Sequence, residues 1–232
     1  MNWFHVLLAL LLLSLNGYAN NRVSLSEYLR KYSIADLRPT QAAVGFREVK
    51  RKKNKIENLK SHKNLQEYFE GNSVPVVLGP NDQVYMIDHH HFTLAASRAG
   101  YNEVYIHIIA DLSALNIQQF WKEMKSRAWV YLKIKGRTIS EYMLPRYITG
   151  LVDDPYRALA GKVLQKDGFK KTETPFAEFE WADFFRTRIS SELVDKDYTR
   201  AVEVALKLAK TDAAKKLPGY NGNALCIEVY AQ

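Results

Sequence analysis

The chain of 232 residues has a single cysteine, Cys226, so it cannot form an internal disulfide bond. Its stability must therefore come from a packed core, even in an oxidising compartment. Cys226 lies in an alternating apolar tail, NALCIEVYAQ, and we expect it to be a small buried residue. Repeats and low-complexity tracts are also absent. With 47% hydrophobic and 25% charged residues, the composition excludes a disordered chain and is typical of a globular protein.

The chain also lacks a hydrophobic run long enough to cross a membrane. Its apolar run VLLALLLLSL covers residues 6–15, whereas a spanning helix needs roughly 20 apolar residues. Gly17 and Ala19 follow as small residues before a cleavage site, although the preceding MNWFH has no Lys or Arg. We predict that residues 1–19 are a cleaved signal peptide and that the protein is secreted or periplasmic, with no integral membrane span after cleavage. A retained anchor and a cytoplasmic start are the alternatives.

Acidic residues are fewer than basic ones, with 25 Asp and Glu against 33 Lys and Arg, which gives a net charge of +8. Such an excess favours anionic partners, among them nucleic acid, nucleotide phosphates, acidic polymers and an anionic membrane surface. A solvated basic surface without a specific partner explains the same charge. The sequence leaves the oligomeric state open.

Strand-like and helix-like segments alternate in the first half of the chain, and helices dominate the second half. Apolar runs predict strands in SVPVVLG, QVYMID, EVYIHIIAD and WVYLKI, and helices in HHFTLAASRAG and SALNIQQFWKEMKS. Two earlier helices are predicted: SLSEYLRKY, with a capping-box spacing from Ser24 to Glu27, and a longer one that starts near Pro39. The fold class is therefore mixed α/β. We predict a sheet-and-helix core at residues 20–136 and a helical extension packed on it at residues 137–232.

Half of the six histidines stand together in YMIDHHHFTLAASRAG, residues 85–100. Asp88 follows a predicted strand and precedes a predicted helix, which is the place of an N-cap. The amides of His89, His90 and His91 would then be free donors at the positive end of the helix dipole, a site that suits a phosphate. Their imidazoles would add donors or acid–base groups near neutral pH. In the alternative, Asp88 only caps the helix, and the histidines pack or face water.

A shared metal ion does not explain the three histidines, because consecutive helical side chains fan out by about 100° each. We therefore assign no metal site to them. A divalent metal as cofactor stays open, since ligands from elsewhere in the chain are not visible in the pattern.

The histidine stretch resembles the ParB/sulfiredoxin superfamily, in which an apolar strand leads into Asp-Gly-His-His-Arg and then a helix. The segments LRPTQAAVGFREVKRKK, DDPYRALAGKV and TPFAEFEWADFFR are similar to its ParB-like nuclease branch, so the resemblance covers about residues 33–190. It implies a ParB/sulfiredoxin fold whose motif loop cradles a phosphate of a nucleotide or nucleic acid. Asp88, His90 and His91 fall on the motif's Asp and two His.

Two positions depart from the pattern. His89 stands where the pattern has Gly, and Phe92 stands where it has Arg, so the usual guanidinium clamp is missing from the loop. The reactive cysteine of the sulfiredoxin branch is absent from this loop, which argues against that chemistry. No clear helix-turn-helix reader of the kind that partition proteins carry follows the core.

We therefore predict an exported ParB-like nuclease, that is, a phosphoester hydrolase. The predicted catalytic residues are Asp88, His90, His91 and Glu178, with His90 or His91 transferring a proton and Asp88 orienting them. The predicted phosphate-binding residues are His89, His90, His91, Lys50, Lys53, Gln41 and Arg157.

Purely structural roles for several of these residues stay open. Gln41 could cap a helix, the Lys/Arg run at 47–55 could be a solvated helix face, Arg157 could belong to an ordinary first helical turn, and Glu178 could form a purely structural pair with an arginine. A non-catalytic nucleic-acid or polyanion-binding module and a nucleotide-dependent, kinase-like enzyme are the alternative functions.

Overall fold

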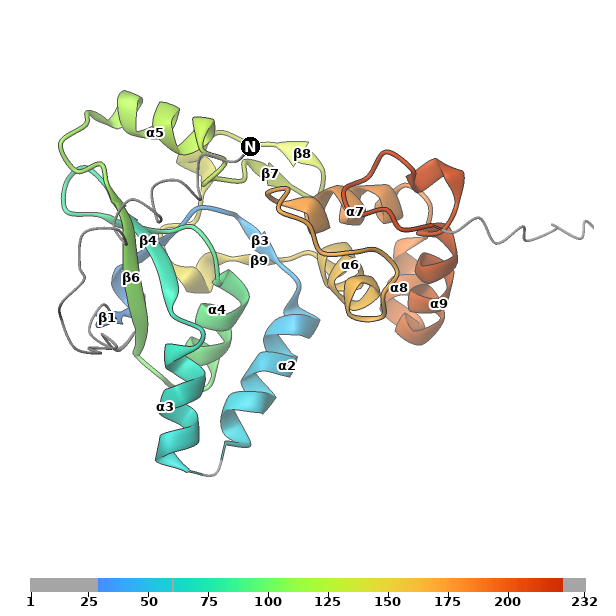
Figure 1. Ribbon diagram of the computed structural model, residues 1–232, viewed down its shortest axis with the longest axis horizontal. Helices are drawn as coiled ribbons and strands as arrows, with labels where there is room; N and C mark the ends of the chain where they lie inside the picture. The colour runs from blue at the N-terminus through green and yellow to red at the C-terminus, as the bar shows by residue number, and fades with distance from the viewer. Residues whose placement is uncertain (1–28, 60, 223–232) are drawn as a thin grey trace, which may run out of the picture.

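A computed structural model describes residues 29–59 and 61–222. The predicted signal peptide, the Ser24 to Glu27 capping box and Cys226 lie outside the described residues. The described chain forms an α/β part around a curled five-stranded sheet, with a helical part beside it (Figure 1). The predicted mixed α/β class is thereby confirmed.

The five strands of the sheet lie in the order β1–β6–β4–β5–β2. They are β1 (Arg30–Ser33), β2 (Leu37–Pro39), β4 (Val74–Leu78), β5 (Val84–Met86) and β6 (Glu103–Asp111). Strands β4 and β5 form an antiparallel hairpin, whereas β4 pairs in parallel with β6, and β5 in parallel with β2. Because side chains alternate along a strand, Val76 packs into the core on one face and Val77 into the core on the other.

Helices cover both faces of the sheet. On one face lie α2 (Phe46–Glu57), α3 (His62–Glu70) and α4 (His90–Arg98), which bury Val49, Phe69 and Phe92. On the other face lies α5 (Ile117–Ser126), which buries Phe120 and Met124. Burial of large apolar side chains on both faces stabilises the sheet without any disulfide.

The helical part has a core of its own. It consists of α6 (Pro155–Gln165), α7 (Ala177–Arg186), α8 (Ser191–Lys196) and α9 (Tyr198–Leu208). Its centre is a stacked pair, Phe169 on Trp181, with ring centroids 4.2 Å apart. None of the described helices has the length and apolar character that crossing a bilayer requires.

Short elements join the two parts. Strand β3 (Ala43–Val44) pairs in parallel with β9 (Val152–Asp153), and a hairpin of β7 (Lys133–Ile134) and β8 (Arg137–Thr138) follows α5. Four 3₁₀ turns complete the described elements: η2 (Ile34–Asp36), η3 (Glu141–Met143), η4 (Ile148–Gly150) and η5 (Asp212–Ala214). The backbone from Thr40 to Gly45 therefore runs along the junction, and this places it beside the histidine stretch.

Two predicted helices near the N-terminus are corrected. The described end of SLSEYLRKY is strand β1, because it pairs with β6 in the register Arg30 opposite Ile106. The helix expected from Pro39 begins instead at Phe46, since Pro39 ends strand β2 and the following residues form β3. In both segments, pairing with a distant strand overrides the local signal. The predicted boundary at residue 137 stays a prediction.

Candidate phosphate site

Helix α4 begins at His90, and its N-cap position is held by His89 rather than by Asp88. His89 has a left-handed backbone, with φ 63°. The Asp88 carboxylate accepts the amide of His89 at 2.6 Å instead of reaching into the first helical turn. The expected N-cap was therefore wrong by one residue, because the chain needs a left-handed residue to turn from β5 into α4. The imidazole of His89 points away from this turn and donates through Nδ1 to the carbonyl of Asn72 at 2.8 Å.

The first turn of α4 keeps free amide donors, as expected for a helix N-terminus. The first amide bonded within the turn is that of Thr93, which donates to the carbonyl of His89 at 2.9 Å. The amides of His90, His91 and Phe92 precede it, and no acceptor for them is found among residues 29–59 and 61–222. These three amides form the positive end of the helix dipole, where an anion is favoured.

His90 is a buried acceptor in this structure. Its side chain is 2% exposed, and its Nε2 accepts the amide of Thr40 at 3.2 Å. Burial lowers the pKa of His90 to about 3, so the imidazole is neutral at pH 7. His90 therefore ties the end of β2 to α4, and its remaining proton must sit on Nδ1.

His91 has the same role one residue further on. Its Nε2 accepts the amide of Gly45 at 3.0 Å. Burial, and then the positive charges of Arg157 and Lys52, hold the pKa of His91 well below its usual value. Both imidazoles are thus neutral. Asp88 does not orient them, since the one bond found for its carboxylate within the described chain is to the His89 amide.

The cation that α2 turns toward this loop is Lys52, which the sequence prediction missed. Burial lowers the pKa of Lys52, and the carboxylates of Glu48 and Asp88 oppose that shift. The predicted Lys53 pairs with Glu57 on its own helix, and Lys50 is exposed without a contact to the loop in the described chain. Helical periodicity would have found Lys52, because it lies between the buried Val49 and Ile56 on the same face.

Arg157 is a second cation at the site, and its guanidinium is poorly paired. Its side chain is 15% exposed, and the nearest carboxylate oxygen, Oε2 of Glu178, is 3.7 Å away. The buried Nε has no hydrogen-bond partner within the described chain. The guanidinium also lies over the ring of Phe179, 5.0 Å from its centroid. Buried guanidinium groups are normally fully hydrogen-bonded, so this one has donors to spare for an anion.

Asp154, the neighbour of the predicted residues in DDPYRALA, is structural. Its carboxylate is 1% exposed, caps α6 through the amides of Tyr156 and Arg157, and pairs with Arg186 at 2.7 Å. The segment is an acidic cap followed by Pro155 at the first helical position, as in an ordinary first helical turn.

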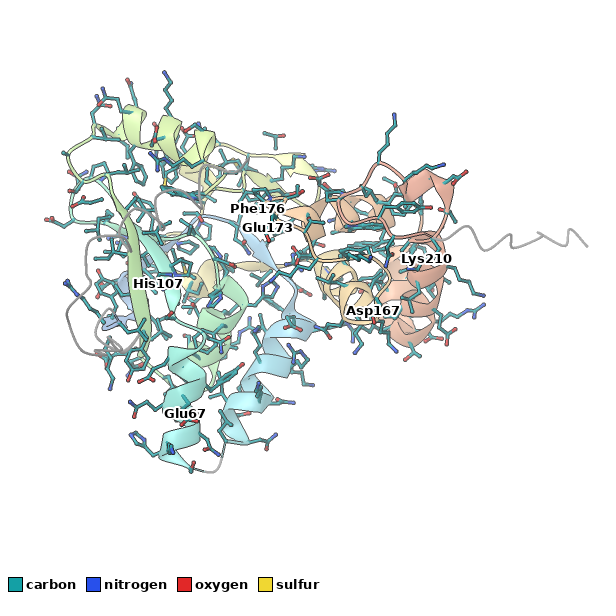
Figure 2. All side chains as sticks on the ribbon, in the orientation of Figure 1. Glu67, His107, Asp167, Glu173, Phe176 and Lys210 are labelled. Atoms are coloured by element: carbon teal, nitrogen blue, oxygen red, sulfur yellow. The ribbon has the colours of Figure 1, made fainter. Side chains whose placement is uncertain are left out.

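A cavity of about 340 Å³ at the junction brings several predicted residues together. Gln41, Asp88, Arg157 and Glu178 all line it. Gln41 is 7% exposed, and its amide donates to the carbonyl of Ala43 at 2.8 Å. The far wall comes from the loop before α7 and includes Phe176, which Figure 2 shows between the α/β part and the helical part. The predicted His89, His90, His91, Lys50 and Lys53 do not line this cavity, and neither does Lys52.

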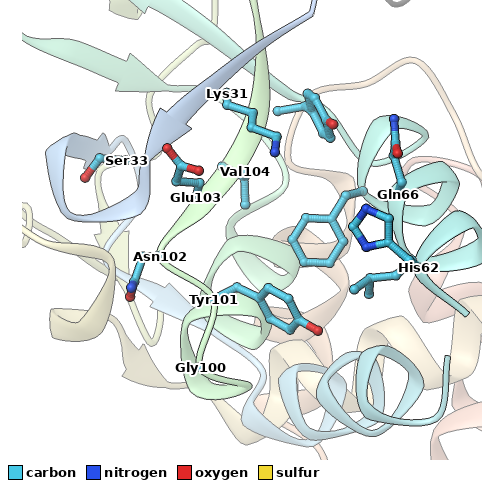
Figure 3. A pocket seen from close by; sticks show the side chains of 12 residues that line it. Lys31, Ser33, His62, Gln66, Gly100, Tyr101, Asn102, Glu103 and Val104 are labelled. Atoms are coloured by element: carbon cyan, nitrogen blue, oxygen red, sulfur yellow. The ribbon is translucent and has the colours of Figure 1, made fainter. Parts of the chain in front are cut away.

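A larger cavity, of about 630 Å³, lies elsewhere, between α3 and the β1 edge of the sheet. Figure 3 shows Lys31, Glu103, Tyr101 and His62 around it. None of the residues that the sequence predicts for the site lines it, so volume alone does not select the functional site. Within the described ranges, no three His, Cys, Asp or Glu side chains come together as a metal-binding group.

The curled sheet and the strand–turn–helix loop with free amides agree with the fold that the resemblance to the ParB/sulfiredoxin superfamily implies. The sequence matches the family described as "Putative ParB-like nuclease" over residues 30–187, more than half of the chain. The protein therefore belongs to the ParB-like nuclease family, as the sequence predicted.

Two solved structures are similar to this chain. Protein Atu1540 from Agrobacterium tumefaciens is 40% identical, with a TM-score of 0.76 over 84% of this chain and 98% of its own. The C-terminally truncated chromosome-partitioning protein ParB from Caulobacter crescentus, complexed with CTP-gamma-S, is 11% identical over 76% of this chain and 91% of its own, with a TM-score of 0.29. A superposition this poor carries no ligand across to this chain. No curated protein matches the sequence.

Proposed function

We propose that the cavity binds a phosphate group of a nucleotide or nucleic acid and that the protein hydrolyses a phosphoester bond there. One observation carries the proposal: the guanidinium of Arg157 is 15% exposed, lies 3.7 Å from Glu178 and has a buried Nε without a partner in the described chain, in a cavity that Asp88 also lines. The free amides of His90, His91 and Phe92 and the ammonium of Lys52 add positive potential on the α4 side.

The two imidazoles support the backbone rather than transfer protons in this proposal. Both are neutral and accept backbone amides through Nε2, and neither lines the cavity. Two carboxylates that line the cavity, Asp88 and Glu178, are the groups left for proton transfer. A water oxygen would bond to phosphorus as the bond to the leaving oxygen breaks. One carboxylate takes the proton of the water and then gives that proton to the leaving oxygen.

A non-catalytic binding module is the second candidate. The low pKa values of His90 and His91 favour it, because they leave the site without a protonated imidazole as a general acid at pH 7. The net charge of +8 supports binding to polyanions in either case.

Incubation with single-stranded and double-stranded DNA and RNA, with and without divalent metal, separates the two candidates. Glu178→Gln is the test variant, and Glu173→Gln is its control, because Glu173 lies in the loop that leads into α7 but does not line the cavity. A hydrolase loses turnover in Glu178→Gln alone and keeps it in Glu173→Gln. Binding without turnover in the wild type supports the module, and the absence of both refutes the proposal.

We also propose that the protein is exported by cleavage after Ala19, on the pattern of residues 6–19. Mass spectrometry of the protein recovered from an expressing bacterium measures this directly. A chain that starts at Met1 or Asn2 in the cytoplasm would refute export.

A further inference from the structure

The loop between α6 and α7 brings a pair of lysines to the same cavity, and no function assigned so far uses them. Lys170 and Lys171 line the cavity, and both side chains are exposed. The backbone beneath them is fixed, because the amide of Lys170 donates to the carbonyl of Gly219 at 2.8 Å. Just before them, Phe169 stacks on Trp181 with an interplanar angle of 9°. The loop therefore presents two ammonium groups from a rigid backbone on the helical wall of the cavity.

A phenylalanine with a strained backbone lies on the same wall. Phe176 has φ 60°, an uncommon value for a bulky side chain. Its carbonyl accepts the amide of Phe179 at 2.8 Å, and its ring lies 5.0 Å from the ring of Tyr131. The ring is partly exposed and lines the cavity. Such strained backbone is concentrated at ligand-binding sites, and a partly exposed ring offers a surface on which a base can stack.

The size of the cavity limits what can enter it. A cube of 340 Å³ has an edge of about 7 Å, whereas the major groove of a DNA duplex alone is about 12 Å wide. A single nucleotide unit fits such a volume, whereas an intact duplex is too wide to reach the bottom of the cavity. The cavity also has cations from two elements, Arg157 of α6 and the lysine pair of the loop that follows α6.

We propose that the cavity binds single-stranded nucleic acid, with one phosphate at Arg157, a base against Phe176, and the neighbouring phosphate at Lys170 and Lys171. This inference rests on the proposed phosphate site and names its substrate class. A chain with two adjacent phosphates engages both Arg157 and the lysine pair, whereas a mononucleotide engages only Arg157. The lysine pair is therefore a binding element for oligonucleotides alone.

The test compares two double variants that remove the same charge. Lys170→Gln/Lys171→Gln removes the cavity pair. Lys215→Gln/Lys216→Gln removes another exposed lysine pair of the helical part, which does not line the cavity. Fluorescence anisotropy measures binding of a short labelled single strand of DNA between about 50 and 200 mM salt, and calorimetry measures binding of a deoxynucleoside monophosphate.

We expect the cavity variant to bind the single strand about tenfold more weakly and to flatten the slope of log K against log salt by about 0.7, because one phosphate contact is lost. Its affinity for the monophosphate should be unchanged, and the Lys215/Lys216 control should match the wild type in both assays. Phe176→Ala should also weaken the single strand about tenfold, whereas Phe176→Tyr, which keeps the ring, should not. The wild type should prefer the single strand over a duplex of equal length.

The failures are distinguishable. If the wild type binds neither ligand, or Arg157→Gln leaves monophosphate binding unchanged, the proposed phosphate site is wrong and the inference is overturned with it. If monophosphate binding depends on Arg157, but the cavity variant and its control bind the single strand equally, only the lysine subsite is wrong. Equal or tighter binding of duplex by the wild type overturns the preference for single strands.

Discussion

The buried histidine at the start of α4 makes the protein sensitive to mild acid. His90 is 2% exposed and accepts the Thr40 amide, and its pKa falls from 6.5 to about 3 on folding. In the unfolded chain it takes up a proton below pH 6.5, but in the folded chain it does so only near pH 3. Lowering the pH through this window therefore favours unfolding, because the unfolded state binds the extra proton.

The size of the effect follows from the shift. Between the unfolded pKa of 6.5 and pH 5 lie 1.5 pH units, and each unit is worth about 1.4 kcal/mol, so His90 alone should lower the free energy of unfolding by about 2 kcal/mol at pH 5. His91 shifts in the same direction and adds to the loss. Urea denaturation at pH 7 and pH 5 measures the total.

Two variants isolate the contribution of His90. His90→Gln keeps an acceptor near the Thr40 amide but cannot titrate, so its loss of stability from pH 7 to pH 5 should be smaller than that of the wild type by about 2 kcal/mol. His62→Gln changes an exposed histidine on α3 and should leave the wild-type pH dependence in place. Equal pH dependence in His90→Gln and the wild type would show that His90 is not a buried neutral acceptor.

Three further predictions concern the backbone and ion pairs that hold the site. His89→Gly should change the free energy of unfolding by less than about 1 kcal/mol, since glycine suits φ 63°, whereas the β-branched His89→Val should cost about 1–3 kcal/mol in urea denaturation. Gly45→Ala should lower the free energy of unfolding by about 1–3 kcal/mol, because its Cβ would lie 2.7 Å from backbone atoms of Ala158 and force α2 away from α6. Asp154→Asn should cost about 3–5 kcal/mol by chemical denaturation, because it leaves Arg186 without its buried partner.

Each of these has a matched comparison. Gly71→Ala adds a methyl group at the end of α3, where the nearest atom is 3.2 Å away, and should be milder than Gly45→Ala. Asp212→Asn removes an exposed ion pair with Lys215 and should cost less than about 1 kcal/mol. If Asp154→Asn were as mild as Asp212→Asn, the buried pair would not stabilise the junction. Equal costs for His89→Gly and His89→Val would contradict the strain at that residue.

Local signals in the sequence predicted helix α4 well. A strand, a short polar turn and an apolar helical pattern lead to Gly100, which has φ 87°. The amide of Tyr101 then donates to the carbonyl of Ala96, and that of Gly100 to Ser97, which closes the helix as expected for a glycine at this position. The free amides of the first turn follow from any helix start. The one-residue error at Asp88 arose because a left-handed histidine is invisible in a sequence pattern.

Long-range pairing explains the other errors. Residues 30–33 have local features of a helix, but they pair with Glu103–Ile106 of β6 instead. The roles of His90 and His91 also depend on distant backbone. Their Nε2 atoms accept the amides of Thr40 and Gly45, which lie 50 and 46 residues away in sequence. A pattern of three histidines predicts a polar loop, but not that two of them are neutral supports for its backbone.

The departure at Phe92 shows how the site keeps its charge. An arginine stands at this position in the pattern that the loop resembles, yet here the side chain is 1% exposed and packs edge-on against Phe69 at 5.2 Å. Position 92 therefore belongs to the core beneath α4, and a cation for the loop has to come from another element. Arg157 of α6 meets that need, because its guanidinium reaches the same cavity with donors to spare. In the proposed function, the helical part thus completes the phosphate site that the α/β part begins.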